Sequence, residues 1–520
     1  MTVSIKALIV ILAIAAVVFR LAKPIALRFC DERDFSRRRN VWFILTVTAF
    51  FSPNFWLFVL IAAPLLAWAG RKDKNPIALY LLMLHVIPSI PLDIPAPGVN
   101  AFFDLDIYRL LSICILVPTA WRLRKSTETT RIHGMTSMDA LLLAYGALQI
   151  VLFVPPDLPN HVILQDTFTN DLRRAFLFFI DVYILYYAVS RSCSSRESIV
   201  DAQAAFCLSC ALMAALAVFE AGRHWLLYPD LAMRWSTYAN AGFYRFRGDQ
   251  LRAQASSGNT LALAYLLAIG CGFWLYLQSH IESKLIRISV PALLCLGLLA
   301  TYSRGPWLGL VVIYISVIAL SPRAVPNLLK GIVGAVILIM LVGLSPLRDR
   351  VANFLPFMSG SMDEQASFSV SYRQRLAESA WEIIVKHPLL GDQLAVSEME
   401  VLRQGEGIID LVNTYAEITL FYGFVGLTLF MGLMLFALAK ASRMAKTVAR
   451  ESPDLALLGF CLTGCILGTL VMLATSSFVY GYAIIFYVIA GFAAAYANLG
   501  RISRPGTLAR GPLDQSPELR

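Results

Sequence analysis

Charged side chains are scarce in this 520-residue sequence, and their scarcity excludes an ordinary water-soluble protein. Asp, Glu, Lys and Arg make up only 15% of the residues, whereas 58% are hydrophobic. Soluble globular proteins usually carry about 25% charged residues. The mean hydropathy of the chain is +0.66. A lipid bilayer must therefore be the solvent for much of this chain.

Long hydrophobic runs take up most of the sequence. In hydrocarbon every backbone amide needs a partner inside the protein, so an apolar run of roughly 17 to 25 residues has to cross as a helix. We predict an all-α polytopic membrane protein with about 12–15 transmembrane helices and two long external loops. The predicted spans lie near residues 5–22, 41–52, 55–70, 76–91, 106–122, 138–154, 174–190, 199–221, 258–278, 287–303, 305–320, 328–345, 411–439, 455–476 and 479–498.

The net charge of +10 follows from the placement of Lys and Arg beside these runs. Lys and Arg bracket the runs on one side, as the positive-inside rule predicts for cytoplasmic loops. The opposite short loops, at 52–54 and 92–105, contain neither residue. We therefore predict an external N-terminus, a cytoplasmic C-terminus and no nucleic-acid partner.

The sequence also lacks the pattern of a disulfide framework or a metal site. All nine cysteines fall in predicted spans or cytoplasmic loops, where disulfides are not expected. Cys207 and Cys210 form a C-x-x-C pair without a second ligand pair, so we expect no metal. The first apolar run lacks a basic start and a cleavage site, which predicts an uncleaved anchor. The segment 501–520, rich in Pro, Gly and Arg, predicts a disordered cytoplasmic tail.

Two external segments, residues 222–257 and 346–410, are too long to be simple connections. They carry Arg223, Arg234, Arg245, Arg247 and Arg252 in the first, and Arg348, Arg350, Arg373, Arg375, Lys386 and Arg403 in the second. Guanidinium groups bind phosphate oxygens in pairs, so a cationic pocket at the outer membrane surface suits the diphosphate of a lipid carrier. For any single arginine, a solvated loop surface is the alternative.

We predict a helix inside the second loop, from Ser371 to Lys386. Pro388 sets its end, because the residue before a proline disfavours the helical conformation. Its apolar residues lie on one side, which suits a helix along the membrane interface. Arg373 would then lie in the first turn, where the helix N-terminus favours an anion.

Four motifs follow one another in these loops and the adjoining spans. They are Tyr244-Arg245-Phe246-Arg247-Gly248 with Leu251-Arg252-Ala253; Thr301-Tyr302-Ser303-Arg304-Gly305; Arg373 followed by His387-Pro388-Leu389-Leu390-Gly391; and Asn413-Thr414-Tyr415 followed by Gly423 and Gly426. In order and topology they resemble the O-antigen ligase and polymerase superfamily, which are integral-membrane glycan transferases. The resemblance covers residues 170–495.

The resemblance implies a GT-C-like protein of the bacterial inner membrane. Its periplasmic face would transfer a glycan from undecaprenyl diphosphate to an acceptor hydroxyl, with no metal or other cofactor. The implied regions are N-terminal transmembrane helices over 1–170, a ligase- or polymerase-like core over 171–500 that includes the loops 222–257 and 346–410, and the tail 501–520. The implied partners are an undecaprenyl-diphosphate-linked oligosaccharide, the bilayer and other polysaccharide assembly proteins.

The resemblance also implies roles for individual residues. Arg373 and Arg304 would act in catalysis, and Arg245, Arg247, Arg252 and Arg375 would bind the diphosphate.

One departure from the family concerns the catalytic base. The family places a His, thought to activate the acceptor hydroxyl, where this chain has Val412. Asp410, Glu406 and Glu417 are the nearest titratable groups, and we favour Asp410, because burial can raise a carboxyl pKa toward the working pH. His387 is a further candidate, although a His beside Pro388 at a helix end more often caps carbonyls.

Polymerase is favoured over ligase, because the ligase interpretation depends more on the missing His and because residues 410–415 look like those of exopolysaccharide members. A ligase acting on a lipid or protein acceptor is the first alternative, a flippase or transporter of lipid-linked sugars the second, and a partner-binding protein the third. Transporters keep their sites near the midplane, where this chain has chiefly His85 and Asp181. We expect Asp181 to pair with an arginine such as Arg174, and His85 to be a hydrogen-bonded buried imidazole.

Overall fold

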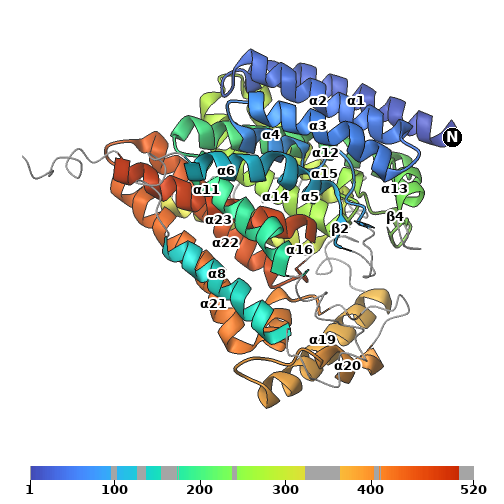
Figure 1. The fold of residues 1–520 in the computed structure, drawn as a ribbon, viewed down its shortest axis with the longest axis vertical. Coiled ribbons are helices and arrows are strands. Elements are labelled where there is room, and N and C mark those ends of the chain that lie inside the picture. The colour runs from blue at the N-terminus through green and yellow to red at the C-terminus, as the bar shows by residue number, and fades with distance from the viewer. Residues whose placement is uncertain are drawn as a thin grey trace, which may run out of the picture.

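The computed structural model describes residues 2–94, 102–125, 136–153, 173, 175–236, 243–321, 364–402, 409, 411–478 and 480–502. These residues are almost entirely helical, which confirms the predicted fold class (Figure 1). The N-terminal helices are α1 (Thr2–Ala26), α2 (Glu32–Phe51), α3 (Phe55–Lys72), α4 (Pro76–Met83), α5 (Ile107–Leu111), α6 (Val117–Lys125) and α8 (Ser137–Phe153). The later ones are α11 (Ile184–Ser192), α12 (Arg196–Arg223), α13 (Pro229–Trp235), α14 (Thr260–Leu277), α15 (Lys284–Ala300), α16 (Arg304–Leu320), α19 (Glu364–Lys386), α20 (Ala395–Glu398), α21 (Thr414–Val448), α22 (Pro453–Leu473) and α23 (Tyr480–Ile502).

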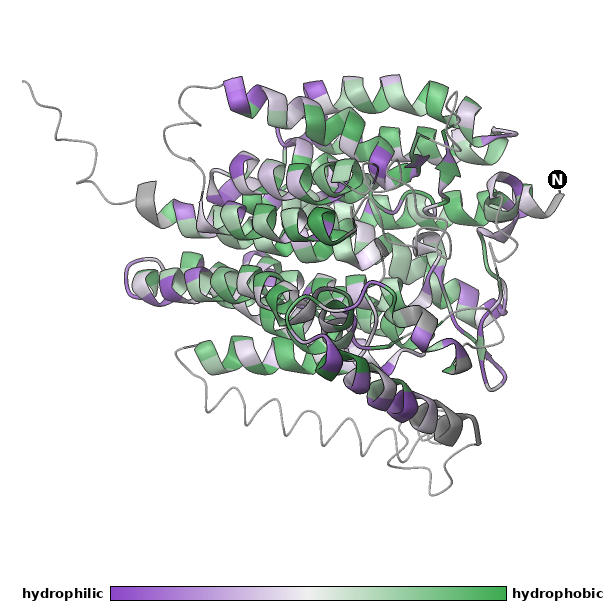
Figure 2. Ribbon diagram, turned by 60° about the horizontal axis from the view of Figure 1, so that its bottom comes forward, coloured by the Kyte–Doolittle hydropathy of each residue, from purple (hydrophilic) through white to green (hydrophobic). Residues whose placement is uncertain are grey.

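Eight helical segments within the described residues are long and apolar enough to cross a membrane. They are Ser4–Ala26, Phe55–Lys72, Ala175–Ser192, Arg196–Arg223, Thr260–His280, Thr414–Val448, Pro453–Leu473 and Gly481–Leu499. Two further apolar helices, Ser137–Leu152 and Arg304–Leu320, are shorter. Hydrophilic residues gather at the two ends of the bundle and hydrophobic ones fill its middle (Figure 2). The chain is therefore a multi-pass membrane protein.

Some predicted spans differ from the structure. The span expected over 76–91 is only the eight-residue helix α4, about 12 Å long at 1.5 Å per residue. Pro88 and Pro91 exclude a helix that continues to residue 91, because proline lacks the backbone N–H and disfavours a helical residue before it. The span expected over 174–190 is confirmed by the helical segment Ala175–Ser192. The span expected at 328–345 and the tail beyond Ile502 lie outside the described residues.

Helix α14 lies at the centre of the bundle, where it packs against α12, α15, α16 and α22. Helices α16 and α22 pack especially closely through glycines. A Cβ atom at Gly309 would lie 2.2 Å from Met472, and one at Gly468 would lie 2.3 Å from Ile313. Small residues at such crossings let transmembrane backbones approach each other. This packing fixes α16, and therefore Arg304 at its start.

The long loops meet at one end of the bundle, which we call the loop face (residues 224–236, 243–259, 301–303 and 474–478). Ser4 at the start of α1 lies there too, because its hydroxyl donates to Asp230 at 3.1 Å. In Figure 1 the loop face is on the right, with the N-terminus, α13 and the strand β4 (Gln250–Leu251). The N-terminus thus shares a face with the long loops, as the charge pattern predicts.

Buried arginines toward the opposite end are all matched by carboxylates. Arg38 binds Asp73 and Asp201, each at 2.7 Å, and so ties α2, the end of α3 and α12 together. Arg191 binds Asp139 at 2.9 Å.

Replacing Arg38 by Met is expected to lower the free energy of unfolding by about 3–5 kcal/mol, because two buried carboxylates lose their cation. Lys74→Met is the matched control: its pair with Asp31 has side chains 78% and 56% exposed, so about 1 kcal/mol or less is expected. Thermal unfolding in detergent measures both, and equal small effects would contradict the assigned role of Arg38.

Of two predictions about ionisable groups in the spans, the pairing of Asp181 with an arginine is confirmed and the hydrogen bonding of His85 needs correction. Asp181 pairs with Arg109, whose Nη2 lies 2.9 Å from its Oδ2; Arg174 lies outside the described residues. His85 is buried, as expected, but neither ring nitrogen has a hydrogen-bond partner among the residues described. Its nearest aromatic neighbour is Tyr108, in an edge-on contact with ring centroids 6.0 Å apart.

Candidate active site at the loop face

The first component of the site is a short β-hairpin that carries three arginines. Strands β3 (Phe246–Arg247) and β4 pair antiparallel, with Arg247 opposite Gln250. Gly248 makes the turn at a φ of 55°, a conformation that glycine adopts without strain. The N–H of Arg252 donates to the carbonyl of Arg245, which extends the pairing by one residue. We call residues 245–252 the arginine hairpin.

The Ser-Arg-Gly motif forms the second component, the turn between α15 and α16. Arg252 donates from Nε to the carbonyl of Thr301 and from Nη2 to Oγ of Ser303, both at 3.0 Å. Arg247 donates from Nη1 to the carbonyl of Tyr302, also at 3.0 Å. Tyr302 has a φ of 51°, which is uncommon for a residue other than glycine. The turn thus offers successive carbonyls to the arginine hairpin and holds it beside Arg304.

Four arginines come together here, namely Arg247, Arg252, Arg304 and Arg373, which we call the arginine cluster. Burial and then the charges of Arg304 and Arg373 lower the pKa of Arg247. Burial and then the charges of Arg247 and Arg245 lower the pKa of Arg252 to about 10. The contributions of neighbouring arginines to both shifts indicate that these positive charges lie close to one another.

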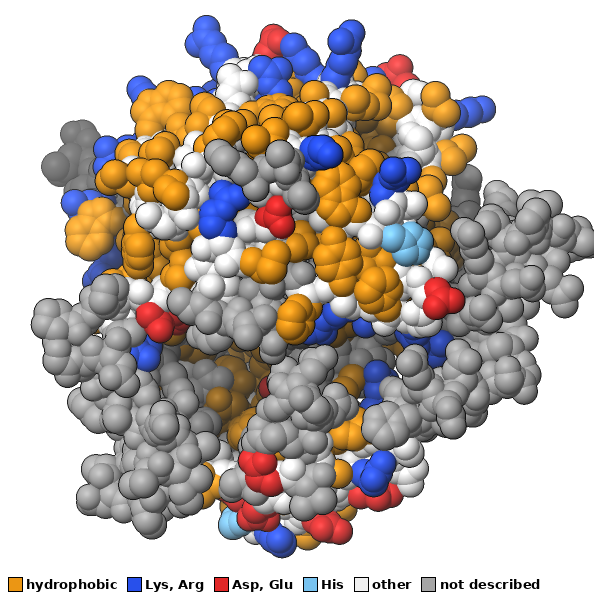
Figure 3. All heavy atoms as spheres, turned by 90° about the vertical axis from the view of Figure 1, so that its right-hand side faces the viewer, with side chains coloured by type: hydrophobic (Ala, Val, Ile, Leu, Met, Phe, Trp, Pro, Cys, Tyr) orange, Lys and Arg blue, Asp and Glu red, His pale blue; other side chains and the backbone are white. Residues whose placement is uncertain are grey.

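No ion pair joins the arginine cluster to a carboxylate within the part of the chain that the structure describes. The buried Nε of Arg304 has no hydrogen-bond partner there either. Arg38 and Arg191, by contrast, each have their carboxylates. The loop face is hollowed between the main body and a smaller lobe, and Lys and Arg side chains gather at the hollow (Figure 3). An anion is the ligand that such a site would favour.

Helix α19 brings Arg373 into the cluster from the second loop. The helix ends at Lys386, as predicted, but it begins at Glu364, seven residues before the predicted start. Arg373 is therefore in the third turn, and its predicted position at a helix N-terminus is wrong. The polar segment 364–370 continues the helix because it contains no proline or glycine.

The His-Pro-Leu-Leu-Gly motif docks α19 onto a kink in α21. The N–H groups of Phe424 and Val425 donate to the carbonyls of Pro388 and Leu389 at 2.8 and 3.2 Å. Gly423 interrupts α21 with a φ of 62° and a ψ of −170°, and a Cβ there would lie 2.1 Å from the carbonyl oxygen of Leu389. The motif and the following glycines are thus one joint that positions α19.

The other two predicted diphosphate-binding arginines, Arg245 and Arg375, lie outside the arginine cluster. Arg245 is exposed at the hairpin, close enough that its charge affects Arg252. Arg375 is exposed two residues after Arg373 on α19, and residues two apart on a helix point to different sides. The arginine cluster therefore does not include Arg375.

The residues predicted around the catalytic base are only partly described. Asp410 and Glu406 lie outside the described residues. Val412, at the position of the family His, has a φ of 49°, and its N–H donates to Oγ of Ser477 at 3.0 Å. Glu417 accepts from the N–H of Phe478 at 3.3 Å. His387 is exposed just after α19.

Asn413 and Tyr415 have clear structural roles. The side chain of Asn413 caps α21 by accepting from the N–H groups of Tyr415 and Ala416 at 3.0 and 3.3 Å. The Tyr415 hydroxyl donates to the carbonyl of Leu470 at 2.5 Å, which ties α21 to α22.

Sequence reasoning missed Glu220, in the last turn of α12. Its buried carboxylate accepts from the backbone N–H groups of Leu227 at 3.0 Å, Gln254 at 3.0 Å and Ala255 at 2.8 Å. It therefore fixes the end of the arginine hairpin to the bundle. The sequence signal that could have identified Glu220 is a single acidic residue at the end of the apolar run that leads into the first long loop.

Comparison with known proteins supports the resemblance seen in the motifs. Residues 290–431 match the protein-family model described as O-antigen ligase. The match takes in the Ser-Arg-Gly turn, α19 and the Asn-x-Tyr segment, and leaves the arginine hairpin outside it. A comparison with curated proteins gave no significant match. Residues 290–431 of this chain are thus similar to the O-antigen ligase domain, which supports the resemblance to the ligase and polymerase superfamily.

Proposed function

We propose that this protein is a polysaccharide polymerase that transfers glycan repeat units from undecaprenyl diphosphate to an acceptor sugar hydroxyl. The reaction would take place at the periplasmic face of the bacterial inner membrane. The observation that carries the proposal is the arginine cluster, four cations from three segments (the arginine hairpin, the start of α16 and α19) with no carboxylate counter-ion among the residues described. A match to the O-antigen ligase family in a multi-pass membrane protein agrees with it.

The arginine cluster suits the chemistry of glycan transfer. The acceptor oxygen attacks the anomeric carbon, the bond from that carbon to the phosphate oxygen breaks, and the carrier diphosphate leaves with the electron pair. Donors placed beforehand where this charge develops lower the barrier. Arg247 and Arg252 are held by the turn at 301–303 through some of their N–H groups, and a guanidinium has five, so the others can bind phosphate.

The length of helix α21 supports the proposal that the substrate is a lipid embedded in the membrane. Lys440 begins the cationic end of this helix, and about 20 residues, or about 30 Å of helix, span the hydrocarbon. Counting back from Lys440 reaches the region of Leu420, beside the joint that holds α19. The joint would then lie at the outer boundary of the hydrocarbon.

Exposed apolar side chains agree with that depth. Trp381, Val385 and Leu389 are exposed at the end of α19, as are Phe424 and Val425 on α21. We propose that they face the lipid interface, where Trp is common. The arginine cluster would then lie at the level of lipid head groups, where a carrier presents its diphosphate.

The acceptor hydroxyl needs a base, and we propose Asp410 for this role, with Glu417 as the alternative. The carboxylate would take the hydroxyl proton as the new bond forms. Val412 cannot do so, because its side chain has no titratable group.

Purified protein incubated with a synthetic carrier-linked repeat unit is expected to give a ladder of longer glycans and free carrier diphosphate. No product from protein that remains folded would overturn the proposal. Transfer only to a lipid or protein acceptor would indicate a ligase. In cells, a deletion strain should accumulate single lipid-linked repeats, whereas long polymer still on its carrier would also indicate a ligase.

A further inference from the structure

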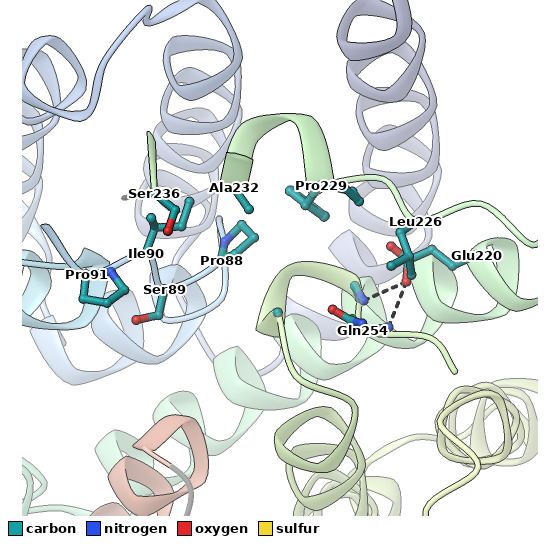
Figure 4. Close-up of a pocket in the computed structure, with 13 residues that line it drawn as sticks. Pro88, Ser89, Ile90, Pro91, Glu220, Leu226, Pro229, Ala232, Ser236 and Gln254 are labelled. Carbon is teal, nitrogen blue, oxygen red and sulfur yellow. Dashed lines mark hydrogen bonds between the residues drawn. The ribbon is translucent and has the colours of Figure 1, made fainter. Parts of the chain in front are cut away.

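A cavity of about 270 Å³ lies on the loop face, beside the arginine hairpin (Figure 4). Helix α13 and the segment Pro88–Pro91 form one side of it, and the turn at 254–258 forms another. At about 30 Å³ per water molecule, the space would hold roughly nine waters. The cavity is thus large enough to receive one sugar ring.

The cavity wall is rigid. Pro88, Pro91 and Pro229 line it, and proline fixes its own backbone φ. Glu220 holds the opposite wall, because its carboxylate binds the N–H groups of Gln254 and Ala255 (Figure 4). Such a wall does not have to reorganise when a ligand enters.

The lining combines apolar surface with a few polar groups. Ile90, Leu226 and the prolines supply apolar contacts, while Ser89, Ser236 and the Gln254 side chain supply polar atoms. The Ser89 hydroxyl donates to Asp106 and Nε2 of Gln254 donates to the carbonyl of Phe243, so the Ser89 oxygen and Oε1 of Gln254 can act as acceptors. Sites for small ligands are typically built in this way, with a few polar groups that fix orientation. A sugar ring suits this combination of surfaces, because its C–H faces can contact the apolar walls and its hydroxyl groups can form hydrogen bonds with the polar atoms.

The cavity and the arginine cluster share one segment of chain. Gln254 follows Arg252 by two residues, so their Cα atoms are at most about 7.6 Å apart. Arg252 itself is fixed to Thr301 and Ser303. In a carrier-linked glycan the first sugar is bonded directly to the diphosphate, so a diphosphate on the cluster would place that ring near the cavity.

We infer that this cavity receives the sugar ring joined to the diphosphate of the donor, and that its shape selects that sugar. The inference rests on the proposed function, because it takes a carrier-linked glycan as the substrate. It assigns specificity to α13, Glu220 and the segment 88–91, all outside the residues that match the O-antigen ligase family.

Ala232→Phe tests the inference by filling the cavity from α13, and Met233→Phe is the matched control. Ala232 lines the cavity, whereas the neighbouring Met233 is 58% exposed. With the purified full chain and a polyprenyl-diphosphate-linked repeat unit, Ala232→Phe is expected to raise KM roughly tenfold or more. Met233→Phe should keep the wild-type KM. Ala232→Val, a smaller change, should raise KM less and serves if the Phe variant does not fold.

Inhibition by polyprenyl diphosphate without a sugar separates the cavity from the arginine cluster. This probe should inhibit wild type and Ala232→Phe equally, because it needs only the cluster. A folded Ala232→Phe or Ala232→Val variant with wild-type KM would overturn the cavity inference alone. Equal weakening of substrate binding and of inhibition by the probe would do the same. A wild type that neither elongates the substrate nor is inhibited by the probe would overturn the proposed function, and the inference with it.

Discussion

Replacing Arg373 by Lys, and separately Arg247 by Lys, is expected to reduce glycan synthesis by roughly 10²–10³-fold, the usual effect of removing one donor to a developing oxyanion. The guanidinium of Arg247 donates to the carbonyl of Tyr302 and still has N–H groups for phosphate. A lysine ammonium is a single point charge on a flexible stem and cannot reproduce that fork. Arg373 is exposed and has no carboxylate partner among the described residues, so its loss should affect the substrate and not the fold.

Arg375→Lys is the control on the same helix. It removes a guanidinium from α19 at similar exposure, but on a different side from Arg373. We expect nearly normal polymer from this variant, together with unchanged thermal stability in both α19 variants. Polymer length and amount in a complemented deletion strain measure the effect. Full-length glycan at normal levels in the Arg373 or Arg247 variant would refute the role of the arginine cluster.

Gly423→Ala is expected to lower both thermal stability and activity strongly. A residue other than glycine at this φ and ψ costs about 1–3 kcal/mol in backbone strain. The added Cβ would also lie 2.1 Å from the carbonyl oxygen of Leu389, so α19 would have to move away from α21. Because α19 carries Arg373, displacement of the joint should weaken the arginine cluster as well.

Gly432→Ala on the same helix is the matched control for the joint. A Cβ at Gly432 would meet Leu141 at 3.6 Å, an ordinary contact, and alanine favours helix more than glycine does. Thermal unfolding and the transfer assay should therefore show little change. If Gly423→Ala were as stable and active as Gly432→Ala, the docking of α19 through this joint would be wrong.

The difference between expected and observed α19 shows where sequence patterns lose precision. Its end at Lys386 was predictable, because Pro388 acts on the residues directly before it. Its beginning was not, since several residues that can cap a helix, among them Asp363, Ser367 and Ser369, precede Ser371 in the sequence. Arg373 was consequently assigned to a helix N-terminus, although its link to the site is its nearness to Arg247 and Arg304.

The sequence by itself determined that this chain is a helical multi-pass membrane protein with arginine-rich loops, because hydropathy and charge act locally on each segment. The motifs also indicated the family whose model matches residues 290–431. Only the tertiary structure decided which arginines meet, that Glu220 fixes the hairpin and that a sugar-sized cavity lies beside it. Those features depend on residues far apart in the chain, such as Arg247 and Arg373, which lie 126 positions apart, and local patterns carry no information about which distant residues meet.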